Sequence, residues 1–222
     1  MILFNFINYI NIKAISPKFK DFDKGIDVSS WQQDIDWKQV KKSGIKFAMI
    51  RCGYGKSSNQ IDRKFHNNIK QAQNAGIDVG VYHYSYAQST DDALEEAKSC
   101  IKIIKDYKLQ YPVAFDIEDP SIEKLDKRIK TDICDTFCTY IQEQGYKTCI
   151  YTNPNWLKNH LYYNELFPKF DLWLAHWGVE KPSFPCIMWQ YSSKGQIDGI
   201  NTYVDLNVIS NKISNINKVP KE

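Results

Sequence analysis

Residues 111–120 read Tyr-Pro-Val-Ala-Phe-Asp-Ile-Glu-Asp-Pro. Valine, phenylalanine and isoleucine alternate along this run and favour a β-strand, and a proline near each end bounds it. Successive side chains of a strand point to opposite faces, so Asp116 and Glu118 should share one face. Their Cα atoms should then lie about 6.6 Å apart, which is two strand rises of about 3.3 Å. The stretch therefore predicts a buried strand that ends in two neighbouring carboxylates.

Two carboxylates this close repel each other, and one of them tends to keep its proton near neutral pH. A proton donor beside an ionised partner is the pair that cleavage of a glycosidic bond requires. The same short pattern also fits a strand end with a solvated acidic rim. Asp116 and Glu118 are therefore candidate catalytic residues whose interpretation depends on the rest of the chain.

Strand and helix patterns alternate on both sides of this stretch, without a linker rich in Gly, Pro or Ser. This alternation is typical of one α/β domain with a parallel sheet. Nearly eight strands predict a small, TIM-like (β/α) barrel with weak helices in its second half. The alternative, a doubly wound open sheet, would normally carry a Gly-rich phosphate turn after the first strand, where residues 28–31 read Val-Ser-Ser-Trp. Strands are expected near residues 25–32, 46–52, 78–87, 111–120, 146–152, 171–177, 186–191 and 204–208, and helices near 37–43, 62–75, from 90 onward, 129–144 and 153–160.

Polar residues mark the ends of several expected strands. The carboxyl ends of the strands are where active sites of such barrels form. The residues at or near these ends are Asp27, Tyr82, Asp116, Glu118, Gln190 and Asp205.

Composition sets the broad class of the protein. The 222 residues are 43% hydrophobic, which suffices for one domain with a substantial core. A net charge of +3 is too weak for a nucleic-acid binder, although it mildly favours an anionic polymer such as a bacterial cell wall. Aromatic residues make up 14% of the chain, which fits both sugar stacking and an aromatic core.

The two ends differ from the rest of the chain. Residues 1–16 are apolar but interrupted by Asn5, Asn8 and Asn11, so they fit either a degraded secretory signal or a poorly ordered extension. They are too short to span a bilayer, and no other stretch predicts a transmembrane helix. We therefore divide the chain into an extension or signal segment (1–20), a barrel domain (21–212) and a loose tail (213–222), with no membrane partner.

The cysteines leave their redox state open. An even number permits disulfides, and buried free thiols are an equal alternative. No Cys-x-x-Cys pair occurs, and Cys134 and Cys138 have no clustered histidine that would complete a metal site. The six are Cys52, Cys100, Cys134, Cys138, Cys149 and Cys186.

An ordered set of short motifs resembles the glycoside hydrolase family 25 lysozymes, the Chalaropsis-type N-acetylmuramidases. No single motif is specific, but together they follow the order of the family over nearly the whole barrel domain. The matching segments are 25–29, 80–84, 115–118, 171–175, 189–191 and 204–207.

The resemblance implies an irregular, flattened barrel with an acidic groove at its carboxyl-terminal face. It also implies hydrolysis of the β-1,4 bond between N-acetylmuramic acid and N-acetylglucosamine in bacterial peptidoglycan. Glu118 matches the general acid and Asp116 the acid that assists the transition state, while Asp27 and Asp205 match two further acids of the groove. No metal or organic cofactor is implied.

The remaining site candidates are substrate-binding residues: Tyr82 and Gln190 match groove residues of the family, and Tyr54, Tyr151 and Trp177 are added as neighbours at strand ends. Trp177 is the best candidate for sugar stacking. Three other tryptophans, Trp31, Trp173 and Trp189, are interpreted as core, and His83, which follows Tyr82 and so points away from the groove, as structural.

Several alternatives stay open at this point. Asp116 could attack the sugar directly or orient the substrate's own N-acetyl group, and we favour the second because Asp-x-Glu resembles substrate-assisted chitinases. A non-catalytic glycan-binding barrel and a chitinase-type glycosidase are the rival functions. We expect a monomer that is secreted or acts in a phagosomal or lysosomal lumen.

Overall fold

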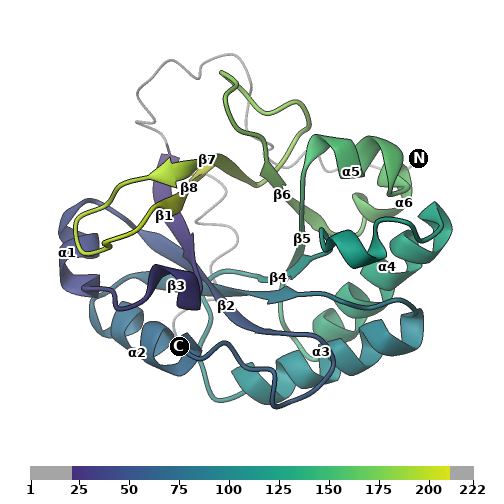
Figure 1. Cartoon of the computed structure of the whole chain (residues 1–222), viewed down its shortest axis with the longest axis horizontal. Helices are drawn as coiled ribbons and strands as arrows, with labels where there is room; N and C mark the ends of the chain where they lie inside the picture. The colour runs from purple at the N-terminus through teal and green to yellow at the C-terminus, as the bar shows by residue number, and fades with distance from the viewer. Residues whose placement is uncertain (1–21, 211–222) are drawn as a thin grey trace, which may run out of the picture.

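The computed structural model describes residues 22–210, which form a closed barrel of eight strands in sequential order (Figure 1). The expected single α/β barrel is thereby confirmed. The N-terminal extension 1–20 and the tail 213–222 lie outside the described residues. The strands are β1 (Phe22–Val28), β2 (Phe47–Tyr54), β3 (Asp78–Tyr84), β4 (Val113–Asp116), β5 (Thr148–Thr152), β6 (Asp171–Ala175), β7 (Met188–Gly195) and β8 (Val204–Ser210).

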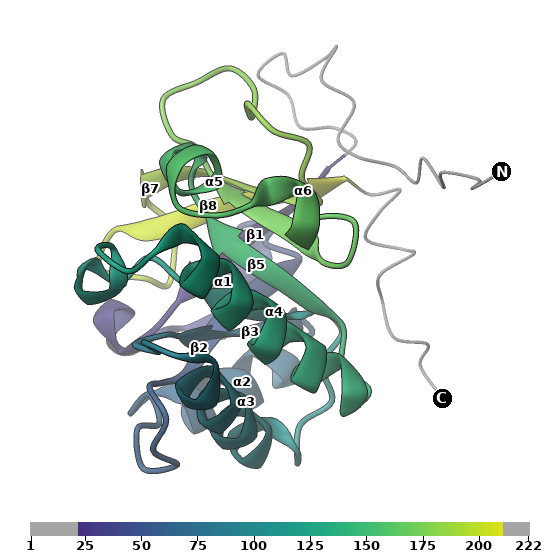
Figure 2. The same cartoon turned by 90° about the vertical axis from the view of Figure 1, so that its right-hand side faces the viewer.

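The helices lie on the outside of the barrel, and the longer ones cover β2 to β5 (Figures 1 and 2). Side chains of Asp36, Ser89, Asp126 and Asn153 cap four of the α-helices, which explains where these helices begin. Within residues 22–210, none of the helices has the length and apolar character needed to cross a bilayer. The helices are α1 (Trp37–Lys42), α2 (Phe65–Asn74), α3 (Thr90–Ile104), α4 (Lys127–Glu143), α5 (Pro154–Asn159) and α6 (Tyr163–Leu166), with short 3₁₀ segments at Ser30–Gln32 and Pro120–Ile122.

The sheet is not entirely parallel, in contrast to the expectation from sequence. Strands β1 to β7 run parallel, but β8 is antiparallel to both of its neighbours, β7 and β1. Only residues 196–203 connect β7 to β8, which is too short for a parallel crossover and long enough for a hairpin. Asp205 therefore lies at the start of its strand rather than near its end, and this reversal brings it to the same pole as the carboxyl ends of β1 to β7.

Two apolar layers flank the sheet. Alternation along β4 shows the division, because Val113 and Phe115 pack against the helices while Ala114 packs inside the barrel. The interior cluster consists of Phe47, Met49, Tyr111, Ala114, Cys149, Trp173, Ile187, Met188 and Ile209. Asp116 follows Ala114 by two residues, so it points into the mouth of the barrel, above this cluster.

Candidate active site

A pocket of about 300 Å³ opens at the carboxyl-terminal mouth of the barrel. Five predicted site residues line it: Asp27, Tyr82, Asp116, Tyr151 and Asp205. The other lining residues are Ser29, Trp31, Gln32, Arg51, Tyr84 and Trp173. The polar strand ends identified in the sequence thus meet at one place.

The remaining predicted residues lie around this pocket rather than on its wall. Glu118 adjoins it through Asp116, and Gln190 and Trp177 adjoin it through hydrogen bonds described below. Tyr54 lines a neighbouring cavity of about 700 Å³ together with Arg63 and Tyr86.

Asp116 and Glu118 are close for a different reason than expected. Strand β4 ends at Asp116, so Glu118 lies in the following loop instead of on the same strand face. The Glu118 N–H donates to Asp116 Oδ1 at 3.3 Å, which holds the loop against the strand end. Asp119 then caps the 3₁₀ segment that begins at Pro120, and this segment turns the chain away from the sheet.

Burial gives Glu118 the properties of a proton donor. It raises the pKa of Glu118 from its usual value to about 7, although hydrogen bonds from Thr152 and Asn153 partly oppose the shift. The Thr152 hydroxyl donates to Glu118 Oε1 at 3.1 Å. The cause differs from the expected one, because removal from water rather than repulsion by other carboxylates is what raises this pKa. Glu118 can consequently hold a proton at mildly acidic to neutral pH.

Asp116 is more deeply buried, with 7% of its surface exposed. Burial and then repulsion by Glu118 raise its pKa, while the Glu118 amide and the Arg51 guanidinium lower it. Two such carboxyls share protons as a pair. Because the amide and the cation both favour the ionised form of Asp116, we assign the proton of the pair to Glu118.

Asp27 and Asp205 form a second carboxyl pair, as directly opposed partners on the antiparallel strands β1 and β8. Burial, followed by repulsion from Asp205, raises the pKa of Asp27. Burial raises the pKa of Asp205 as well, and a hydrogen bond between the two carboxyls raises the pKa of Asp27 further while it opposes the shift of Asp205. Asp27 is therefore the member of this pair that holds a shared proton.

A buried amide network holds Asp27 in place. Its Oδ1 accepts hydrogen bonds from Gln190 Nε2 at 2.9 Å and from Asn207 Nδ2 at 2.7 Å. Gln190 Oε1 in turn accepts from the Tyr151 hydroxyl at 3.1 Å and from Trp177 Nε1 at 2.9 Å. Gln190 is only 1% exposed, so it orients Asp27, Tyr151 and Trp177 from below the pocket.

Six of the lining residues were not assigned to the site from the sequence, and Trp31, Arg51 and Tyr84 are the most informative of them. Trp31 was interpreted as core, which is wrong: it is 73% exposed at the pocket rim, because the 3₁₀ segment after β1 turns it outward. Arg51 and Tyr84 line the pocket too. Alternation could have found both, because Arg51 follows the inward Met49 by two residues and Tyr84 follows Tyr82 by two.

The other tryptophans and the cysteines can be compared with their interpretation from the sequence. Trp173 and Trp189 are buried in the core, as predicted, and Trp177 is 51% exposed. The six cysteines are all free and buried, so the disulfide alternative is not the one found in this structure.

Comparisons with known proteins agree with this fold. The family model described as glycosyl hydrolases family 25 matches residues 26–200, a range that includes Asp27, Asp116 and Glu118 but ends before Asp205. The autolytic lysozyme of Clostridium acetobutylicum is 31% identical over 195 residues, which cover 86% of this chain. The alignment covers 56% of that relative, so the chain spans little more than half of its length.

Solved structures give the same result. The bacterial lysozyme from Streptomyces coelicolor superposes with a TM-score of 0.77 at 29% identity, covering 84% of this chain and 91% of that one. The modular autolysin LytC from Streptococcus pneumoniae, solved in complex with a synthetic peptidoglycan ligand, superposes with a TM-score of 0.74 at 28% identity, covering 84% of this chain and 46% of that one. From the family match over most of the barrel, together with these likenesses, it follows that the chain belongs to glycosyl hydrolases family 25.

Proposed function

We propose that this protein is a lysozyme that hydrolyses the β-1,4 bond between N-acetylmuramic acid and N-acetylglucosamine in bacterial peptidoglycan. The observation that carries the proposal is the half-buried carboxyl of Glu118, with a pKa of about 7, beside Asp116 at the mouth of the pocket. The backbone N–H of Glu118 donates to Asp116 and keeps the two residues together. The relatives named as lysozymes, and the synthetic peptidoglycan ligand of one similar structure, support the choice of substrate.

Glu118 is the general acid in this proposal. A glycosidic leaving oxygen needs a proton as its bond to the sugar breaks, and a carboxyl that is still protonated at the working pH can donate it. The Thr152 hydroxyl donates to Oε1 of Glu118 and, together with hydrogen bonds from Asn153, orients the carboxyl.

Asp116, Asp27 and Asp205 stabilise the positive charge of the oxocarbenium-like transition state. Burial and repulsion by Glu118 raise the pKa of Asp116, and the Arg51 guanidinium partly opposes them by favouring the ionised form. We favour a role in which Asp116 orients the N-acetyl group of the substrate, and direct attack by Asp116 on the sugar is the alternative. The exposed rings of Trp31 and Trp177 at the rim would stack on sugar units.

Peptidoglycan is the proposed partner, and the proposed place of action is outside the cell or in a phagosomal or lysosomal lumen. The relatives named as an autolytic lysozyme and as an autolysin solved with a synthetic peptidoglycan ligand favour such a location. The chain is expected to act as a monomer, because the whole pocket is built from one barrel.

The test is the clearing of a suspension of purified bacterial walls. Glu118→Gln keeps the shape of the side chain but removes the titrating proton, so the rate should fall by at least about 10²-fold, the scale of general acid catalysis. Glu143→Gln, an exposed position at the end of α4, is the matched control and should clear walls at the wild-type rate. A folded Glu118→Gln protein within threefold of wild type would contradict the assignment.

The products identify the bond. Walls are digested, reduced with borohydride and then hydrolysed completely, so that each new reducing end is labelled. Reduced N-acetylmuramic acid supports the proposal, whereas reduced glucosamine indicates a glucosaminidase. Activity on chitin alone would favour the chitinase-type rival, and wall binding without any new reducing ends would favour a non-catalytic glycan-binding barrel.

A further inference from the structure

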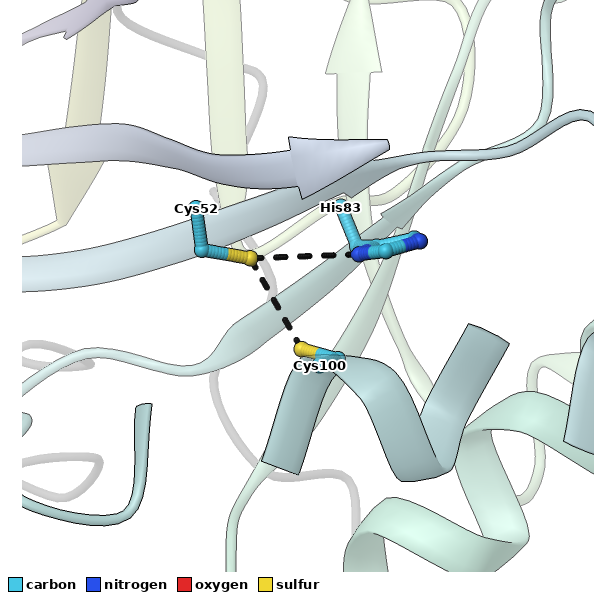
Figure 3. A group of neighbouring side chains, drawn as sticks. All are labelled: Cys52, His83 and Cys100. Atoms are coloured by element: carbon cyan, nitrogen blue, oxygen red, sulfur yellow. Dashed lines mark hydrogen bonds between the residues drawn. The ribbon is translucent and has the colours of Figure 1, made fainter. Parts of the chain in front are cut away.

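Three metal-binding side chains meet in the layer between the sheet and the helices, away from the pocket (Figure 3). Cys52 comes from β2, His83 from β3 and Cys100 from α3, and each is fully buried. Cys52 Sγ lies 3.7 Å from Cys100 Sγ and 3.9 Å from His83 Nδ1. One ligand atom of each residue lies within 4.8 Å of the others, so a single ion can reach all three.

The separation of the two sulfur atoms suits a shared ion. Thiolates bind zinc at about 2.3 Å, and two of them on a tetrahedral ion lie about 3.8 Å apart. The observed separation of 3.7 Å is close to that value and far longer than the S–S bond of about 2.05 Å in a disulfide. Two thiolates and one histidine are a donor set found on zinc, where a small fourth ligand completes the tetrahedron.

The histidine ring already has the orientation that such a site requires. His83 Nε2 lies 3.1 Å from the Gly55 carbonyl oxygen, which can only accept a hydrogen bond. The proton of the neutral ring therefore belongs on Nε2, and the lone pair of Nδ1 is directed toward Cys52 (Figure 3). Metal-binding histidines usually donate their second N–H in this way to a carbonyl or carboxylate.

Glu96 supplies an independent sign that positive charge belongs here. It is 1% exposed, and its Oε1 accepts a hydrogen bond from the Tyr86 amide. Its Oε2 is buried without a hydrogen-bond partner among the described residues, 3.9 Å from His83 Nε2. A cation bound on the far side of the imidazole would polarise the ring and strengthen the attraction between His83 Nε2 and this oxygen.

The charges of the group balance with a dication. A metal ion deprotonates coordinating thiols outright, and two thiolates with Zn²⁺ are neutral overall, which suits a fully buried site.

We propose that Cys52, His83 and Cys100 bind one zinc ion in a structural site that joins α3 to the ends of β2 and β3. The site lies on the outer face of these strands, since Arg51 and Tyr82, next along the chain, point into the pocket. The ion fixes the two strand ends that carry these pocket residues. The proposal is independent of the function proposed above, because it concerns the opposite face of the sheet.

The first test is metal content. The protein is produced in zinc-supplemented medium, purified under reducing conditions and analysed by elemental mass spectrometry, and we expect one zinc ion per chain. Cys52→Ser and Cys100→Ser should each abolish this stoichiometry. Cys186→Ser changes a buried thiol outside the cluster and should retain the ion. A wild-type protein without zinc, or a Cys186→Ser variant that loses the ion to the same extent, overturns the proposal.

A second measurement does not depend on the folding of any variant. The wild-type chain is refolded in reductant with Co²⁺, with Zn²⁺ or with a chelator alone, since a site this deeply buried must load as the chain folds. We expect a thiolate-to-cobalt charge-transfer absorption with Co²⁺ and a higher thermal midpoint with Zn²⁺ than with chelator. Equal midpoints and no such absorption overturn the proposal, as does a Cys52–Cys100 disulfide found in a non-reducing peptide map of the native protein.

Discussion

Thr152 is the side chain that most directly tunes the proton of Glu118. Its hydroxyl donates to Glu118 Oε1 and favours the ionised form. Thr152→Val removes this donor at nearly constant shape, so the pKa of Glu118 should rise above about 7. A general acid must be protonated to act, and the alkaline limb of the pH–rate profile should therefore move to higher pH. The measurement is hydrolysis of a soluble wall fragment across pH at fixed ionic strength.

Thr152→Ser is the matched control, because it keeps the hydroxyl and should leave the alkaline limb where it is. A limb that moves to lower pH in Thr152→Val would contradict the assignment of that limb to Glu118. Asp205 is not among the groups that shift the pKa of Glu118, so Asp205→Asn should change the rate without moving this limb.

Burial of the Asp116 carboxyl lowers the stability of the folded protein at neutral pH. Its folded-state pKa is raised, so the folded protein binds a proton more readily than the unfolded chain, and stability falls as the pH rises through that pKa. Asp116→Asn removes the titrating group and should stabilise the protein near pH 7.

The sign of this effect can be checked by its pH dependence. Denaturant unfolding of wild type and Asp116→Asn is compared at neutral pH and near pH 4, where Asp116 is protonated in the folded state. The gain should shrink at the lower pH, and a variant that is less stable than wild type at neutral pH would show that Asp116 supports the fold as an anion. Glu143→Gln serves again as the control at an exposed position.

The alternation of side chains along the strands and the order of the motifs are the features of the sequence that predict the site. They were enough to predict five residues that line one pocket, namely Asp27, Tyr82, Asp116, Tyr151 and Asp205. The environment of each side chain was not predictable in the same way, because burial is a property of the assembled barrel. The dominant cause of the raised pKa of Glu118 could therefore be found only once the loop after β4 was placed.

Among the elements, β1 and β2 fit together because a glycine faces a large ring. A Cβ atom added to Gly25 would lie 2.3 Å from the Phe47 ring, inside the barrel. Gly25→Ala should therefore destabilise the protein by about 1–3 kcal/mol, as overpacked cores do. Phe47→Leu leaves space at the same place, so the double variant should lose less stability than the sum of the two single changes.

A remote pair provides the comparison. Gly25→Ala combined with Ile133→Val, which is buried on α4, should be additive within about 0.5 kcal/mol. All stabilities are taken from denaturant titrations with a common slope. If the losses of stability in Gly25→Ala and Phe47→Leu were also additive, the strands would be shifting apart to avoid the clash between the new methyl group and the Phe47 ring.

Element types were predictable because each strand and helix carries its own apolar period and caps. The direction of β8 was not extracted from the sequence, although the short connection of residues 196–203 contained the information. The sequence also predicted the end of β4 too far along the chain, because Ile117 continues the β pattern and is buried like a strand residue. Backbone pairing, and not residue type, decides where that strand stops.

At the scale of the whole molecule, the described chain begins and finishes on adjacent strands. Phe22 on β1 is the direct antiparallel partner of Ser210 on β8. A hairpin loop of about 2–5 residues should therefore join these positions without strain. We expect a circular permutant of residues 22–210, joined in this way and opened between Gln144 and Gly145, to fold and to retain wall lysis.

The opening site lies in the exposed turn between α4 and β5, so no strand pairing is interrupted. Circular dichroism and wall clearing are compared with the unpermuted barrel of the same residues. A second permutant, opened between Ala114 and Phe115 inside β4, should fail to fold. Failure of the first permutant as well would show that the barrel needs its natural order to close.

The reversed direction of β8 also affects the tendency of the protein to aggregate at high concentration. By pairing with β7 on one side and β1 on the other, this strand leaves no unpaired sheet edge within residues 22–210. An exposed edge is the template on which chains add to one another as aggregates. The folded barrel offers no such template, so strand-to-strand aggregation would have to begin from molecules in which β8 has detached.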